Sequence, residues 1–226
     1  MTDSTIDQSI ACAEAILQKF QTTGTVNREI YTENYPSVDY SFKSDSYRRA
    51  HLSIVDARET RKLWMMHCTI FPQRDDPSPI FGFDIIAGPS RVSGAFQDFS
   101  CGGDISHPML AWFADRAAAH SWKRDRELPE WGQRIFSPSM IAIGSVDDVE
   151  LARFIQVGLD NLDYYLANVG ATRGRRLDTC MKQNYYCQNQ KLNPHTHRFM
   201  TSLGLSEESA TKFMNEVLFP EVDTKY

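Results

Sequence analysis

Two side chains able to move protons lie within short, mostly apolar segments of the sequence. His67 lies in residues 65–71, and Asp84 lies in residues 80–88. A carboxyl group buried in such a segment without a partner stays protonated near neutral pH, which is the state that a proton donor needs. If two hairpin-linked strands place His67 beside Asp84, they form a proton-relay pair. The alternative is a histidine satisfied in the core and an aspartate that faces water at a strand edge.

The other candidate groups give weaker signals. His195 and His197 offer two imidazoles, but no Glu or Cys stands at the spacing that a zinc site needs. The basic clusters at residues 123–126 and 173–176 are typical of a solvated face, and an acidic partner or a substrate carboxylate is the second interpretation. The sequence contains no glycine-rich nucleotide motif and no nucleophile elbow, so a redox enzyme of this kind must take electrons from outside.

The hydrophobic pattern predicts the elements that position these side chains. Apolar residues three and four apart predict a helix over residues 4–20, capped by Asp3 or Ser4. A period of two then predicts an antiparallel meander, with strands at residues 38–42, 52–54, 63–71, 80–87 and 92–99. Helices are predicted over residues 108–122, 147–167, 177–190 and 206–218, with a strand near residues 140–143. Strands followed by helices indicate an α+β fold.

The composition is that of a globular protein in a reducing compartment. The 226 residues carry a net charge of −5 and are 42% hydrophobic, which favours a single domain over residues 1–226 and argues against a nucleic-acid-binding protein. No apolar run approaches the length of a membrane helix, and the first residues do not resemble a secretory signal. Five cysteines without a C-x-x-C pair favour neither disulfides nor a zinc knuckle, so we expect a cytoplasmic protein.

A series of ordered segments resembles the ferredoxin-dependent bilin reductases, most closely the phycocyanobilin-forming members, over most of the chain. The segments are residues 50–54, 66–72, 79–89, 92–100, 126–132, 135–137, 186–191 and 216–219. The resemblance implies a three-layer α/β/α sandwich with a central, mainly antiparallel sheet, in which biliverdin IXα binds between the sheet and the C-terminal helices. It also implies that no cofactor or metal is bound, since reduced ferredoxin supplies single electrons and the protein supplies protons through bilin radicals. We expect a monomer whose partner is ferredoxin.

The same resemblance implies roles for individual residues. The family's catalytic histidine and aspartate fall on His67 and Asp84. Its propionate-binding residues fall on Ser93, Arg126 and His195, and the last of these positions usually holds a lysine. A guanidinium suits a carboxylate fork, whereas an imidazole is a weaker substitute.

Two departures from the family pattern bear on the product. Ser53 stands where phycocyanobilin-forming enzymes have a glutamate that serves reduction of the D-ring vinyl group. Asn193 and Pro194 stand in place of an aspartate that is usual in the family. The first departure resembles a phage-associated branch that makes phycoerythrobilin through 15,16-dihydrobiliverdin in two two-electron steps. Phycocyanobilin is the alternative product if Asp56 replaces the glutamate after a register shift. A bilin carrier without chemistry is the alternative of another class, against which His67 and Asp84 argue.

Overall fold

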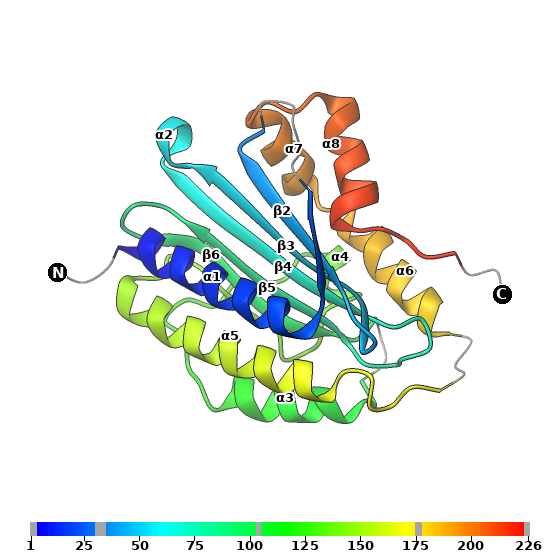
Figure 1. Cartoon of the computed structure of the whole chain (residues 1–226). Coiled ribbons are helices and arrows are strands. Elements are labelled where there is room, and N and C mark those ends of the chain that lie inside the picture. Colours follow the sequence, from blue (N-terminus) through cyan, green and yellow to red (C-terminus); the bar gives the residue numbers. More distant parts are fainter. Residues whose placement is uncertain (1–3, 30–34, 103–104, 175–177, 224–226) are drawn as a thin grey trace.

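The computed structural model describes residues 4–29, 35–102, 105–174 and 178–223. In this part of the chain, seven strands form one sheet in chain order, and each strand is antiparallel to the next (Figure 1). They are β1 (Thr25–Glu29), β2 (Ser37–Lys43), β3 (Tyr47–Ala57), β4 (Leu63–Pro72), β5 (Ile80–Ala87), β6 (Val92–Ser100) and β7 (Ile141–Ile143). Short connections from β2 to β6 enforce the meander, because a crossover to a parallel strand needs a longer segment.

Helices cover both faces of the sheet, which gives the molecule three layers (Figure 1). On one face lie α1 (Thr5–Thr23), α3 (Pro108–Ala118) and α5 (Asp148–Asn168). On the other face lie α6 (Thr179–Gln190), α7 (Pro194–Ser202), α8 (Glu207–Phe213) and the π-helical turn η1 (Met214–Leu218). The short helices α2 (Arg58–Arg61) and α4 (Glu130–Gln133) belong to connections. The predicted α+β sandwich is therefore confirmed.

The two faces of the sheet differ in chemistry because side chains alternate along each strand. The face under α1, α3 and α5 is apolar, and its buried residues include Leu52, Met66, Cys68, Phe83 and Ile85. The opposite face carries polar side chains in the middle of the sheet, among them Ser53, His67, Thr69, Asp84 and Asp98. Since the apolar face supplies the larger core, the polar face is available for a functional site.

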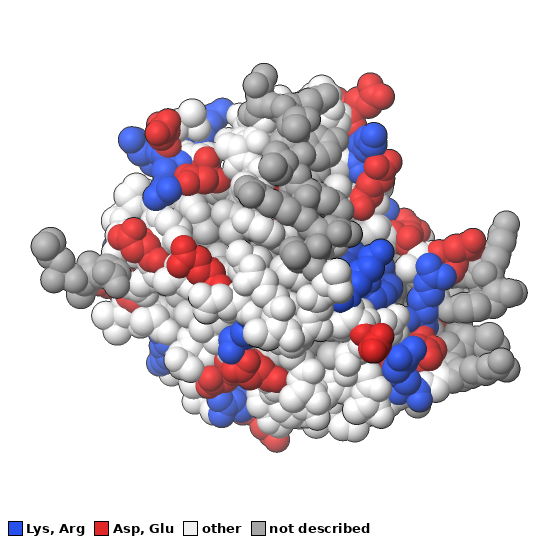
Figure 2. All heavy atoms as spheres, in the orientation of Figure 1, with Lys and Arg blue, Asp and Glu red and all other residues white. Residues whose placement is uncertain are grey.

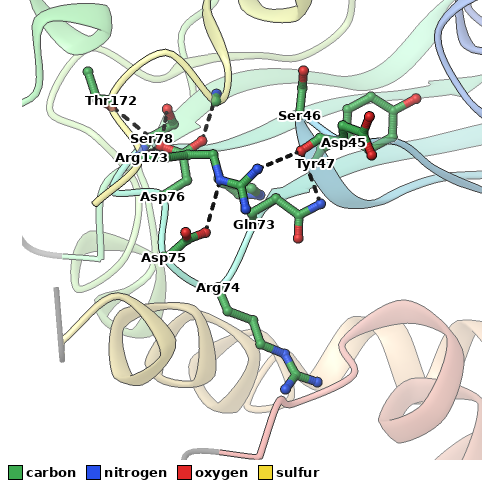
Figure 3. Close-up of polar contacts among 12 residues, drawn as sticks. Asp45, Ser46, Tyr47, Gln73, Arg74, Asp75, Asp76, Ser78, Thr172 and Arg173 are labelled. Carbon is green, nitrogen blue, oxygen red and sulfur yellow. Dashed lines mark hydrogen bonds and ion pairs between the residues drawn. The ribbon is translucent and has the colours of Figure 1, made fainter. Parts of the chain in front are cut away.

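A buried carboxylate ties distant connections together at one end of the sheet (Figure 3). Asp76, in the connection between β4 and β5, accepts hydrogen bonds from the backbone N–H and the hydroxyl of Ser78, at 3.0 and 2.8 Å. It also accepts one from the backbone N–H of Gly170, just beyond α5, at 2.7 Å. Beside it, the carboxylate of Asp75 pairs with Arg173 at 3.1 Å. These contacts, which we call the Asp76 clasp, fix the loop after α5 against the sheet.

The structure differs from the predicted elements in a few places. Strand β1 and helix α7, which begins at Pro194, were not predicted. The helix predicted over residues 108–122 ends at Ala118, and the last predicted helix becomes π-helical from Met214. Ser4 caps α1. Asp3 and residues 175–177, which include part of the second basic cluster, lie outside the described residues.

Candidate active site

His67 and Asp84 lie side by side on the polar face of the sheet. They are direct register partners across β4 and β5. Nδ1 of His67 lies 2.7 Å from Oδ1 of Asp84, and the two side chains are 14% and 33% exposed. The predicted pairing is confirmed by this geometry. From the sequence we considered a carboxyl group buried without a partner, but Asp84 is partly exposed and contacts His67. Its chemistry is therefore coupled to that of the imidazole.

The pair belongs to a row of residues that runs across five strands. Asp39 on β2 pairs in register with Ser53 on β3, Ser53 pairs with His67, and His67 pairs with Asp84. All four side chains stand on the same face because register partners in an antiparallel sheet do so. Phe96 on β6, opposite Asp84, continues the row. We call these five residues the site row.

Two opposing influences act on the charge of His67. Burial lowers the pKa of its imidazole, but the attraction of the Asp84 carboxylate and the hydrogen bond to it act in the other direction. The negative charge of Asp39 adds to this attraction, and the pKa of His67 is raised above its usual value as a result. The imidazole is therefore favoured in the charged form, which has a proton to give.

Several polar atoms of this face have no hydrogen-bond partner among the described residues, although they are buried. They are Nε2 of His67, Nδ1 of His51 and Oγ1 of Thr69. A Cβ added at Gly82, the register partner of Thr69, would meet no atom within 4 Å. Since buried polar groups normally find partners, this group of atoms is typical of a ligand-binding surface.

His51 and Asp39 are site residues that the sequence alone did not reveal. Nε2 of His51 lies 3.0 Å from Oδ1 of Asp39, and the two side chains are 0% and 2% exposed. Burial lowers the pKa of His51 to about 4, against the opposing hydrogen bond to Asp39. Its ring centroid is 6.3 Å from that of His67. The sequence could have indicated His51 as a site residue, because it stands two residues before Ser53 and therefore on the same face of the strand.

An aromatic side chain covers His67 from the helical layer. The ring of Phe219 lies 5.8 Å from the His67 ring in an edge-on arrangement, and Phe219 is 3% exposed. Phe219 follows the π-helical turn η1, a form that is often found at functional sites. Tyr186 of α6 packs on Phe219 with a centroid distance of 6.5 Å. This cover limits the access of water to the imidazole.

Ser93 and Arg126 lie together at the β6 side of the site row. Nη1 of Arg126 donates to the backbone carbonyl of Ser93 at 3.4 Å. The Arg126 guanidinium lies over the Phe96 ring, 5.5 Å from its centroid. Both residues are exposed, and Arg126 places an accessible guanidinium beside Phe96 of the site row. Elsewhere in the first basic cluster, Lys123 pairs with Asp147, as expected of a solvated face.

Asn193 and His195 lie at the start of α7. Oδ1 of Asn193 accepts a hydrogen bond from the backbone N–H of His195 at 3.0 Å, so Asn193 is the N-cap of the helix. The His195 side chain is exposed. In the part of the chain that the structure describes, no hydrogen bond or ring contact joins either side chain to the site row. The structure therefore brings five of the seven predicted site residues together and leaves these two apart.

Asp56 does not replace the missing glutamate. It is the register partner of Trp64, which is buried in the core on the opposite face of the sheet from Ser53. Its carboxylate is 45% exposed and pairs with Arg58 at 2.6 Å. The suggested register shift was wrong because positions 53 and 56 differ in parity, so the two side chains point to opposite faces.

The described residues contain no group of three or more His, Cys, Asp and Glu side chains placed to hold a metal ion. None of their helices is both long and apolar enough to cross a membrane. On the face drawn in Figure 2, acidic and basic side chains lie in mixed groups around a broad uncharged area.

Comparison with known sequences establishes the family. Residues 19–220 match the family model described as ferredoxin-dependent bilin reductase. The chain belongs to this family. It is 30% identical over 180 residues to phycocyanobilin:ferredoxin oxidoreductase of Prochlorococcus marinus (strain MIT 9313), covering 77% of this chain and 67% of the relative. It is 28% identical over 204 residues to the protein of the same name from Gloeobacter violaceus, covering 87% of this chain and 78% of the relative.

Solved structures agree with this assignment. The structure of a protein named PcyX has a TM-score of 0.69 and 30% identity, covering 95% of this chain and 99% of that chain. Tomato phytochromobilin synthase in complex with biliverdin has a TM-score of 0.70 at 16% identity, covering 93% of this chain and 81% of that chain, and supports the fold alone. The chain is thus a ferredoxin-dependent bilin oxidoreductase, and the site row lies on the polar face of its sheet.

Proposed function

We propose that this bilin reductase converts biliverdin IXα to phycoerythrobilin through 15,16-dihydrobiliverdin, with four electrons from reduced ferredoxin and four protons delivered through the protein. The observation that carries the proposal is the hydrogen-bonded pair His67 and Asp84 on a polar sheet face with unpaired buried atoms. Such a face offers both a surface for a flat, polar pigment and a proton source beside it. No organic cofactor or metal takes part, since each electron comes from ferredoxin.

Proton delivery rests on the two members of the pair acting together. Each electron makes the bilin more basic, and a nearby charged imidazole can then release its proton. Nδ1 of His67 is held by Asp84, and Nε2 has no partner among the described residues. Nε2 is therefore the atom that donates to the substrate in this proposal. Asp84, one-third exposed, stabilises positive charge on His67 or on the pigment. The hydrogen bond between the two groups couples the movement of protons at one to the charge of the other.

Substrate orientation depends on the propionates in this proposal. Ser93 and Arg126 bind one propionate, because a guanidinium beside a hydroxyl matches a carboxylate. Asn193 and His195 reach the pigment from α7. Reduced ferredoxin binds transiently to basic residues of this chain in this proposal. The protein is further proposed to act as a monomer in the cytoplasm.

Phycoerythrobilin is favoured over phycocyanobilin because of the residue beside His67 in the site row. Position 53 holds a hydroxyl, which is a poor acid, next to the imidazole. The alternative carboxylate at Asp56 is directed away and paired with Arg58. Without an acid at position 53, the D-ring vinyl group is not reduced, and reduction takes place at the C15 methine bridge and then at the A-ring diene.

An anaerobic assay tests the proposal. The protein is mixed with biliverdin IXα, ferredoxin and a ferredoxin-reducing system, and the pigments are separated by chromatography. We expect 15,16-dihydrobiliverdin to appear first and phycoerythrobilin to accumulate afterwards. Phycocyanobilin as the main product would contradict the product assignment. A stable coloured complex with unchanged biliverdin would indicate a carrier and contradict the enzymatic proposal.

A further inference from the structure

Asp39 is a buried carboxylate in the site row. It is 1% exposed and lies at the β2 end of the row. Its Oδ2 accepts a hydrogen bond from the hydroxyl of Ser37 at 3.0 Å, and its Oδ1 lies 3.0 Å from Nε2 of His51. A buried carboxylate has a high desolvation cost, and an apolar residue of similar size packs a sheet face at lower cost. Its position therefore calls for an explanation other than stability.

The contact with Asp39 determines where His51 carries its proton. With a pKa of about 4, which burial lowers, the His51 imidazole is neutral at pH 7 and has a single ring proton. A carboxylate oxygen accepts hydrogen bonds, so that proton lies on Nε2. Nδ1 is left as an acceptor with no partner among the described residues.

The opposite arrangement holds at His67. Its Nδ1 bonds to Asp84, and its charged form is favoured, so its Nε2 is a donor. The two rings are 6.3 Å apart. Each carboxylate accepts a hydrogen bond from the ring that it contacts. The neutral His51 is then left with an acceptor nitrogen, whereas the charged His67 keeps a proton on its second nitrogen. Asp39 acts on both rings, on His51 through a hydrogen bond and on His67 through its charge.

We propose that Asp39 is a positioning residue for proton delivery, which fixes His51 as a neutral acceptor and holds His67 as the charged donor. The proposal rests on the role of His67 as proton donor in the proposed function. The groups that face His67 from the surrounding elements are Asp84 on β5, Asp39 on β2, and Arg49 and His51 on β3, with uncharged Phe219 beyond η1. The positive charge of Arg49 lowers the pKa of His67, and the negative charge of Asp39 raises it. Removal of the Asp39 charge should therefore lower the pKa of His67.

The first test is a histidine titration by NMR on the pigment-free protein. Asp39→Asn removes the charge, while the amide oxygen still accepts a hydrogen bond from His51. We expect the pKa of His67 to fall by about one unit. The matched control is Asp56→Asn, which removes a carboxylate from the other face of the sheet and leaves the pKa of His67 unchanged. An unchanged pKa of His67 in Asp39→Asn overturns the proposal, whatever happens to the melting temperature.

The pH dependence of bilin consumption gives a second readout. Because His67 acts in its charged form, activity falls as pH rises through its pKa. A lower pKa moves this loss to lower pH, so the alkaline limb shifts by about one unit in Asp39→Asn and stays in place in Asp56→Asn. A lower rate with an unshifted limb would mean a structural role only, and would overturn the proposal.

A third readout needs no variant and covers the case in which Asp39→Asn does not fold. The ring nitrogen shifts of His51 at pH 7 distinguish its tautomers in the unmodified protein. We expect protonated Nε2 and bare Nδ1. A proton on Nδ1 alone, or a charged ring, overturns the proposal. Because neither NMR experiment contains pigment, both outcomes are independent of which bilin, if any, the enzyme produces.

Discussion

At the scale of single residues, the site row concentrates polar groups where a sheet would otherwise be packed with apolar side chains. Ser53 and Asp39 are 2% and 1% exposed, and neither contributes apolar packing. Burial of such groups costs free energy that only hydrogen bonds offset. The unpaired Nε2 of His67 and Oγ1 of Thr69 lack even that compensation within the described chain. The composition of the row is thus explained by chemistry on a ligand rather than by stability.

Position 53 offers a direct test of product choice. Ser53→Glu places an acid beside His67, and we expect phycocyanobilin to appear at the expense of phycoerythrobilin, because the D-ring vinyl group gains a proton donor. Ser53→Ala is the matched control and keeps the original product. Pigment chromatography after anaerobic turnover measures both. If Ser53→Glu binds biliverdin and still leaves the vinyl group untouched, position 53 does not set the site of reduction by itself.

The residues differ in how far the sequence could place them. The apolar period of two in both strands and the short connection between them were enough to predict that His67 and Asp84 lie side by side, because the strands of a hairpin pair locally. The pair Asp39 and His51 required the register of β2 against β3, which a sequence pattern does not provide. The suggested role of Asp56 was wrong because positions 53 and 56 of the strand point to opposite faces of the sheet. The positions of Ser93 and Arg126 beside the row followed from family resemblance and not from any local pattern.

At the scale of elements, close packing of α5 on the sheet depends on a glycine. A Cβ at Gly158 would lie 2.3 Å from a ring carbon of Phe83 on β5. We expect Gly158→Ala to lower the free energy of unfolding by about 1–3 kcal/mol, because overpacking outweighs the better helix propensity of alanine. Urea denaturation measures the change. The control is Gly174→Ala, whose Cβ would meet no atom within 4 Å. Equal midpoints for both variants would contradict this packing argument.

Elements with a clear apolar period were predictable, and those without one were not. α1 and α5 present long apolar stripes, and β4 to β6 alternate or run apolar, so their type was evident. β1 has five residues with a polar majority, and pairing with β2 decides its conformation. α7 has nine residues, and Phe199 and Met200 are its only large apolar residues, so it offers too few positions to establish a period.

At the scale of the whole molecule, the Asp76 clasp lies at one end of the sheet and serves stability, separately from the site row (Figure 3). We expect Asp76→Asn to lower the free energy of unfolding by about 1–3 kcal/mol, because the single amide oxygen can accept from Ser78 or from Gly170 but not from both. Asp75→Asn is the control, since its ion pair with Arg173 is half-exposed and such pairs contribute less than about 1 kcal/mol. Chemical denaturation compares them.

The same pair of variants shows whether stability and chemistry are separable. Well below the unfolding temperature, both should turn over biliverdin at nearly the unmodified rate, because neither residue belongs to the site row. If Asp76→Asn is fully folded and still loses turnover, stability and chemistry do not depend on separate residues, and this expectation is wrong.

Turnover and pigment binding by Asp84→Asn test the central claim, that His67 and Asp84 together deliver protons to the bilin. The amide keeps the size of the side chain but holds no negative charge to stabilise a charged imidazole. We predict that an absorbance titration shows biliverdin bound nearly as in the unmodified protein, while anaerobic turnover falls by about 10²–10⁴-fold. Asp56→Asn, with the same substitution on the opposite face, keeps full turnover. Unimpaired turnover in Asp84→Asn would contradict the account.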